Sequence, residues 1–314
     1  MINFANDSLN KIWLNMENEI LEQFVKNNNV LISEWYEDPK QRVEEDVYFQ
    51  NYSKTTRKKN KEIEHSPLYS NGDGIEYYKY RPEPYLGDPY NCSIVMLNLN
   101  PGFGGEAGDM PLHWKDGILV TDEICKDYYS YAKEFPYIKQ DDNRHEGAKR
   151  WWQSRKVWLD NFVEKVANAE ASSAPFAIEL CPWHSKSWKD LKYKKDENLK
   201  DHISSNVIDP AIEAAKKAQV KFPVCIGKSF ETILPLLGFD KTEYEWNTQR
   251  SDTLEVWPSD PMDGHKLQRT YQLFKNVKNE YILNIWAPGA NKTPSQFFND
   301  AEIVIVNKIK EIIK

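Results

Sequence analysis

Four short apolar runs in the chain from residue 93 onward constrain the fold more than any other feature. They are SIVMLNL (93–99), FAIEL (176–180), FPVCIG (222–227) and YILNIWA (281–287), and each has the length and composition of a buried strand. Helical patterns lie between and after them, at 145–167, 206–218, 228–237 and 295–314. Strands that alternate with helices form mostly parallel sheets that are covered on both faces. The sequence therefore predicts an α/β fold.

The first 90 residues have a different texture. Apolar side chains recur at helical spacing between residues 8 and 26, and the three asparagines at 27–29 predict the end of that helix. Residues 37–65 are polar and charged, and the three prolines of 80–90 are typical of a loop. We therefore predict a helical and irregular N-terminal extension at 1–90, packed on an α/β domain at 91–314.

Composition narrows the class of protein. A net charge of −7 over 314 residues disfavours a surface with general affinity for nucleic acid, although it leaves one basic groove possible. No signal-peptide pattern opens the chain, and no apolar run approaches the roughly 18 residues of a membrane helix. The four cysteines are widely spaced and form no C-x-x-C pair, so neither a disulfide framework nor a zinc site is indicated. We expect a cytoplasmic protein that has no membrane contact, no metal and no cofactor.

The segments that follow the four apolar runs are the candidate site, because ligands of parallel sheets bind beyond the carboxyl ends of the strands. These segments read NPGFGG, CPWHS, GKSF and APGANK. In the first, Pro101 fixes a bend, the glycines let the backbone approach a ligand, and Asn100 offers an amide. The alternative is a glycine-rich connection that binds nothing.

The second and fourth segments also allow two interpretations. Glu179 ends an apolar strand, where a carboxylate is costly unless it is paired or faces a pocket. His184 could be a hydrogen-bonded loop residue or a contact for ligand, and Lys186 opens a lysine-rich stretch that is either a solvated helix face or a phosphate contact. After the last strand, a Pro-Gly turn leads to Asn291 and Lys292, which form either an ordinary turn or a polar contact.

A dinucleotide site is a further alternative. GFGGEA at 102–107 has the G-x-G-x-x-A spacing, and Asp122 follows about twenty residues later. However, the intervening GDMPLHWKDG leaves no room for the full helix that such a site needs.

The four segments together resemble the uracil-DNA glycosylase superfamily, and in particular its branch of single-strand-selective monofunctional uracil-DNA glycosylases. The resemblance covers residues 93–300 and lies in Asn98-Leu99-Asn100-Pro101-Gly102 with Phe103-Gly104, in Glu179-Leu180-Cys181-Pro182, in IGKSF and in Trp286-Ala287-Pro288-Gly289-Ala290-Asn291. It implies a three-layer α/β/α sandwich around a mostly parallel, four-stranded sheet. It also implies an enzyme of DNA repair that flips a nucleotide out of single- or double-stranded DNA and hydrolyses its N-glycosidic bond.

The resemblance also assigns roles to single residues. Asn100 matches the residue that positions the attacking water. The residues that it places around the base are Pro101, Gly102, Phe103, Trp114, Glu179 and Trp286. The residues that it places against nucleic acid are Pro288, Gly289, Asn291 and Lys292, to which the loop after the second strand adds His184 and Lys186.

Two departures from the family pattern affect the predicted function. Glu179 stands where the family has the base-reading Asn, and an ionised Glu would repel O4 of uracil. A protonated Glu could instead pair with the edge of cytosine or adenine, so we expect a cytosine-like or modified base rather than plain uracil. Trp286 stands where the family has His, which removes a cation near the leaving base. The sequence therefore leaves open a glycosylase, a catalytically inactive protein that binds nucleic acid or nucleotides, and the dinucleotide alternative.

Overall fold

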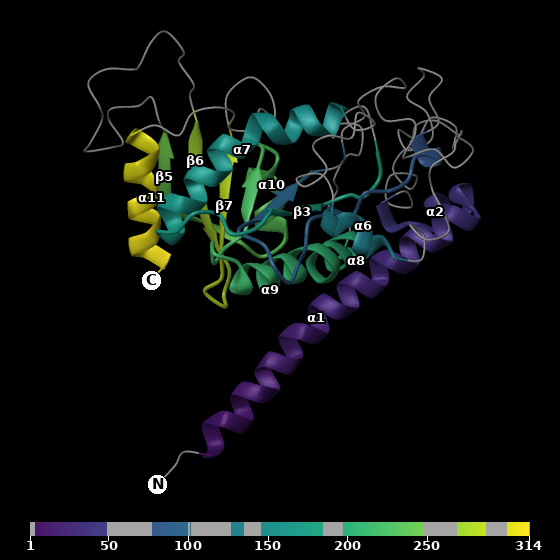
Figure 1. The fold of residues 1–314 in the computed structure, drawn as a ribbon, viewed down its shortest axis with the longest axis horizontal. Helices are drawn as coiled ribbons and strands as arrows, with labels where there is room; N and C mark the ends of the chain where they lie inside the picture. Colours follow the sequence, from purple (N-terminus) through teal and green to yellow (C-terminus); the bar gives the residue numbers. More distant parts are fainter. Residues whose placement is uncertain are drawn as a thin grey trace.

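The computed structural model describes residues 4–48, 77–99, 101, 127–134, 146–184, 197–247, 269–286 and 300–313 (Figure 1). Its α-helices are α1 (Phe4–Glu37), α2 (Pro39–Glu45), α6 (Tyr128–Glu134), α7 (Glu146–Ala167), α8 (Glu197–Ile203), α9 (Asp209–Lys217), α10 (Phe230–Leu236) and α11 (Asp300–Ile313). The 3-10 turn η2 (Tyr77–Lys79) and the π-helical segment η6 (Ser204–Ile208) complete the helical elements. The strands are β1 (Tyr85–Leu86), β2 (Val95–Asn98), β3 (Phe176–Glu179), β4 (Val224–Ile226), β5 (Asp240–Asn247), β6 (Thr270–Lys275) and β7 (Tyr281–Trp286).

The strands form one mixed sheet of seven in the order β1-β3-β2-β4-β7-β6-β5. β3, β2, β4 and β7 pair in parallel, whereas β1 pairs with β3, and β6 with both β7 and β5, in antiparallel fashion. The predicted α/β class is confirmed, and the four predicted runs each contain a strand. The sheet is nevertheless larger than the four strands expected from the sequence, because β1, β5 and β6 extend it at both edges.

The hairpin between β6 and β7 explains part of this difference. Lys275 pairs with Tyr281, and the chain reverses in the five residues between them. Asn276 stabilises the turn, because its Oδ1 accepts hydrogen bonds from the backbone N–H groups of Lys278 (3.0 Å) and Glu280 (2.9 Å). Asn279 takes a left-handed conformation with φ 64°, which asparagine tolerates better than most residues. The two asparagines of KNVKN (275–279) therefore indicate this turn in the sequence.

Alternate residues of the strands belong to two hydrophobic clusters, one on each face of the sheet. In β2, Val95 and Leu97 belong to the cluster that includes residues of α1, α6, α8, α9 and α10. Met96 and its neighbour Ile94 belong to the cluster that includes residues of α7 and α11. Helices therefore cover both faces, as expected for a largely parallel sheet.

The helix α1 does not end at residues 27–29, so that prediction is wrong. It continues to Glu37, because the next turns bury Leu31 and Trp35 in the same cluster as the strands. The indole of Trp35 donates a hydrogen bond to the carbonyl oxygen of Tyr78 (2.9 Å). The second half of α1 packs on the body of the protein, and the first half projects away from it (Figure 1). Burial of the apolar face therefore outweighs the weak helix propensity of three asparagines.

A buried polar cluster joins α11 to the sheet and to α7. Arg269 and Glu302 form an ion pair, and both side chains are almost fully buried. The same oxygen of Glu302 accepts hydrogen bonds from the hydroxyl of Tyr271 in β6 (2.5 Å) and from the indole of Trp158 in α7 (3.4 Å). Such a cluster is costly to disrupt, because each removed partner leaves a buried charge.

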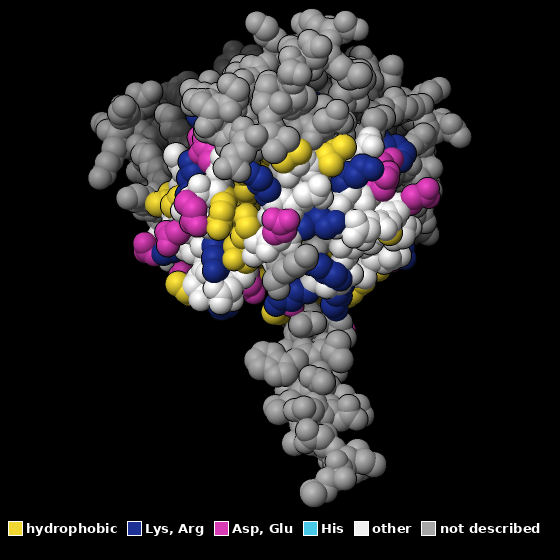
Figure 2. Space-filling view, turned by 90° about the vertical axis from the view of Figure 1, so that its left-hand side faces the viewer, with side chains coloured by type: hydrophobic (Ala, Val, Ile, Leu, Met, Phe, Trp, Pro, Cys, Tyr) yellow, Lys and Arg dark blue, Asp and Glu magenta, His cyan; other side chains and the backbone are white. Residues whose placement is uncertain are grey.

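The face beside α11 and β5 carries charges of both signs, which are interspersed around a narrow hydrophobic strip (Figure 2). Lys241 and Glu245 of β5 form one of the ion pairs of this sheet edge. No described helix combines the length and the apolar composition needed to cross a bilayer.

Candidate functional site

The four predicted segments all begin at the carboxyl ends of the parallel strands. We call this side of the sheet the carboxyl edge. β3, β2, β4 and β7 are consecutive and parallel, so Glu179, Asn98, Ile226 and Trp286 all end strands at the same edge. Neighbouring strands lie about 4.8 Å apart, so this edge spans roughly 14 Å from β3 to β7.

Asn98 and Glu179 form the polar pair at the β2–β3 end of this edge. They are register partners, and Nδ2 of Asn98 donates a hydrogen bond to Oε1 of Glu179 (3.0 Å). The other carboxyl oxygen, Oε2, is buried and has no hydrogen-bond partner in the described part of the chain. Sequence reasoning gave Asn98 no role, although its position as the last residue of an apolar strand was the available signal.

Burial raises the pKa of Glu179 from its ordinary value of 4.5 to about 8, although the hydrogen bond from Asn98 lowers it. The negative charge of nearby Glu83 raises the pKa further. The carboxyl group is therefore mostly protonated at neutral pH. Asn98 donates to Oε1, and a proton on the unpartnered Oε2 leaves Oε1 as an acceptor. Glu179 thus offers one acceptor and one donor side by side, as an amide does.

Lys228 and Trp286 meet at the other end of the edge. Lys228 follows Gly227, whose φ of 136° lies in the region that favours glycine, and its side chain is exposed. Its Nζ lies 4.9 Å from the centroid of the Trp286 indole, within the range of a cation–π contact. The indole N–H also points to Oε1 of Gln272 (3.4 Å). This end of the edge therefore carries a positive charge.

The structure does not bring Trp286 to Glu179. β2 and β4 lie between the strand of Glu179 and the strand of Trp286, and Glu179 lines a cavity beside α1 whose lining does not include Trp286. Pro101 is buried next to the end of β2. The remaining predicted site residues lie outside the described residues; they are Asn100, Gly102, Phe103, Trp114, Lys186, Pro288, Gly289, Asn291 and Lys292.

His184 lies inside the protein rather than on its surface. Its ring is 2% exposed, and Nε2 donates a hydrogen bond to the carbonyl oxygen of Arg81 (3.1 Å). The Arg81 side chain is itself fully buried, and its guanidinium lies 4.1 Å from the ring centroid of Tyr131. His184 therefore holds the loop before β1 against the end of β3. Its predicted contact with nucleic acid would require that loop to move.

Comparisons with protein-family models, with curated proteins and with solved structures give no match to this chain. The function is therefore argued from the geometry of the site and from the motifs.

Proposed function

We propose that this chain binds a flipped nucleobase at the carboxyl edge of the parallel strands and hydrolyses its N-glycosidic bond, as a DNA glycosylase does. The observation that carries the proposal is the carboxyl group of Glu179 at the end of β3, where Asn98 donates to one oxygen, the other oxygen is buried without a partner in the described part of the chain, and burial raises the pKa. Helices on both faces of the sheet and four adjacent parallel strands support the glycosylase-like sandwich that the motifs resemble.

The carboxyl group of Glu179 can recognise a base through two hydrogen bonds. Its Oε2–H would donate to a ring nitrogen, and Oε1, which keeps a second lone pair, would accept from an adjacent amino group. The N3/N4 edge of cytosine and the N1/N6 edge of adenine present this pair of atoms. Uracil has the acceptor O4 where cytosine has its amino group, and the donor N3–H where cytosine has an acceptor nitrogen. We therefore propose a base with an amino group, such as cytosine or a modified cytosine.

The rest of the nucleotide would lie across the neighbouring strand ends. With the base at β3, the glycosidic bond would lie beyond the end of β2, where Asn100 follows in the sequence and would position the attacking water. The phosphates would extend toward β4, where Lys228 supplies an exposed positive charge.

A protein that binds the base without hydrolysis is the second candidate. Trp286 favours it, because an indole in place of the family's His supplies no cation, and its N–H is directed to Gln272. In that case the recognition by Glu179 would be retained and the turnover would be lost.

An excision and binding assay separates these possibilities. Single- and double-stranded oligonucleotides would carry one uracil, cytosine, 5-methylcytosine or adenine, and abasic sites would be measured by alkaline cleavage. We expect a preference for the amino-bearing bases and loss of turnover in Asn100→Ala. If Asn100→Ala only changes the affinity, the chain is a binding protein. Robust excision of uracil alone would contradict the assignment of the base.

The pH dependence tests Glu179 directly. Binding by the wild type should fall as pH rises through about 8, where the carboxyl group loses its proton. Glu179→Gln keeps one donor and one acceptor at every pH, so its binding should stay constant over this range. Parallel pH profiles of the two proteins would contradict the role of Glu179.

A further inference from the structure

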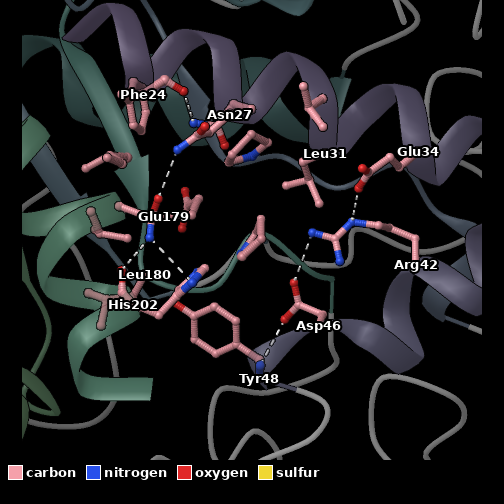
Figure 3. A pocket seen from close by; sticks show the side chains of 17 residues that line it. Phe24, Asn27, Leu31, Glu34, Arg42, Asp46, Tyr48, Glu179, Leu180 and His202 are labelled. Atoms are coloured by element: carbon pink, nitrogen blue, oxygen red, sulfur yellow. Dashed lines mark hydrogen bonds and ion pairs between the residues drawn. The ribbon is translucent and has the colours of Figure 1, made fainter. Parts of the chain in front are cut away.

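A cavity of about 310 Å³ lies between the N-terminal helices and the end of β3 (Figure 3). Its walls come from α1, from the segment Arg42–Tyr48, from the end of β3 and from the helix that runs through α8 and η6. Small-molecule sites occupy roughly 300–1,000 Å³, so the cavity has the size of a site for a small ligand. Most of its lining residues come from the N-terminal extension, to which the sequence assigned no function.

One side of the cavity is apolar. Phe24 and Leu31 of α1 face Ile178 and Leu180 at the end of β3, and Val207 of η6 closes this side. All five side chains are buried in the core cluster, so their positions are fixed by packing. They form a rigid surface that suits the flat face of a planar molecule.

The other side carries a buried carboxylate. Asp46 is 5% exposed, and its Oδ1 accepts a hydrogen bond from the backbone N–H of Tyr48 (2.9 Å). Its Oδ2 lies 3.8 Å from Nη2 of Arg42. Nε of the same arginine lies 3.0 Å from Oε2 of Glu34. A single guanidinium therefore serves two carboxylates. Burial raises the pKa of Asp46, which the charges of Arg42 and His202 oppose, and burial lowers the pKa of His202. The described lining thus holds two carboxyl groups, those of Glu34 and Asp46, around one guanidinium, that of Arg42.

Amide side chains complete the polar side. Asn27 of α1 donates a hydrogen bond to Oδ1 of Asn206 across the cavity (3.3 Å), and Nδ2 of Asn206 also donates to the carbonyl oxygen of His202 (3.0 Å). Asn206 belongs to the π-helical segment η6. Such segments cost stability and occur frequently at functional sites, where they redirect side chains. Here the π-helical turn places Asn206 at the cavity.

We propose that this cavity binds a small, unphosphorylated molecule of about nucleoside size, with a planar body and an amino or amidine group. The planar body would lie on the apolar side, and the amino group would donate to Asp46. The two carboxyl groups around one guanidinium would exclude phosphorylated ligands. The site borders the one proposed above, since Glu179 also lies at the cavity wall, but its ligand contacts Asp46 and does not require the strand-edge function.

Isothermal titration calorimetry on the full chain tests this proposal with adenosine, cytidine and benzamidine as probes. We expect at least one probe to bind, and adenosine or cytidine to bind at least about tenfold more tightly than its 5′-monophosphate. Asp46→Asn keeps the shape and the acceptor for the Tyr48 N–H, so the fold should persist while binding of the probes weakens about tenfold or more. Glu44→Gln is the matched control, because it removes the same charge from an exposed residue of α2 outside the cavity and should leave binding unchanged.

A second variant tests the charge argument independently of Asp46. Asn206→Lys adds a positive charge at a half-buried position of the lining, so benzamidine should bind more weakly and the discrimination against monophosphates should disappear. Absence of binding by all three probes, equal affinity for adenosine and its monophosphate in the wild type, or unchanged affinity in Asp46→Asn would overturn the proposal. Oligonucleotide binding distinguishes the two sites, because Asp46→Asn should retain it and Glu179→Leu should lose it. Either proposal can therefore fail alone.

Discussion

Replacing Glu179 with Gln should change how the stability of the protein depends on pH. The folded protein retains the proton of this carboxyl group up to about pH 8, whereas the unfolded chain releases it near the ordinary pKa of 4.5. Between these values the folded state binds more protons than the unfolded state, so the free energy of unfolding decreases as pH rises. The full loss is reached above pH 8, and none is present below about pH 4.5.

The size of this effect follows from the displacement of the pKa. Each unit corresponds to about 1.4 kcal/mol, which gives about 5 kcal/mol for the whole displacement. Glu179 is only half-buried as a whole residue, although its Oε2 is buried, so solvent screening reduces this value and we expect about 3–5 kcal/mol. The glutamine variant does not titrate and keeps an oxygen that accepts from Asn98. Its stability relative to the wild type should therefore rise steadily between pH 5 and pH 8.

Urea unfolding at pH values from 5 to 9 measures this difference directly, because all other titrating groups occur in both proteins and cancel. Glu197→Gln is the control for the loss of one carboxylate, since that side chain is 81% exposed. A difference between wild type and Glu179→Gln that stays flat across this range would mean that Glu179 ionises normally. The donor–acceptor recognition proposed for it would then lose its basis.

Three further predictions concern stability and binding. Arg269→Met should lower the free energy of unfolding by about 3–5 kcal/mol in urea titrations, because it leaves Glu302 charged and buried, and adding Glu302→Leu should recover most of that loss. Gly87→Ala should lower the free energy of unfolding by at least about 2 kcal/mol, since φ is +92° and the new Cβ would lie 2.3 Å from the carbonyl oxygen of Pro175. Gly238→Ala, at φ +84° with no atom within 4 Å of the new Cβ, should lower it by only about 1 kcal/mol in the same urea titrations. Lys228→Ala should reduce the slope of log affinity for single-stranded DNA against log salt by roughly 0.7, and an unchanged slope would remove Lys228 from the nucleic-acid contact.

The sequence was most informative where hydrophobic patterning alone decides the structure. The buried strands β2, β3, β4 and β7 lie within the predicted runs, because a continuous apolar stretch has few other places in a fold of this size. The strand β5 escaped prediction, since DKTEYEWN is an edge strand whose charged residues resemble those of a loop. The continuation of α1 past Asn27 depended on partners distant in sequence, which no local pattern contains.

The candidate site was also predictable only in part. The sequence identified Glu179 as an unusual carboxylate and allowed for its protonation. The hydrogen bond from Asn98 and the shared face of the two side chains depend on strand register, which only the structure provides. The cavity beside Asp46 was not foreseen at all, because its walls come from segments more than a hundred residues apart.

The packing of α1 against the sheet also affects how the chain must be made. The ring of Phe24 contacts that of Phe176, with centroids 5.9 Å apart, so the first helix leaves the ribosome long before its partner strand is synthesised. At about 5–20 residues per second, the intervening 150 or so residues take roughly 8–30 s to translate. Throughout that time a nascent amphipathic helix has its apolar stripe uncovered, and a chaperone that recognises such stripes would find its target there.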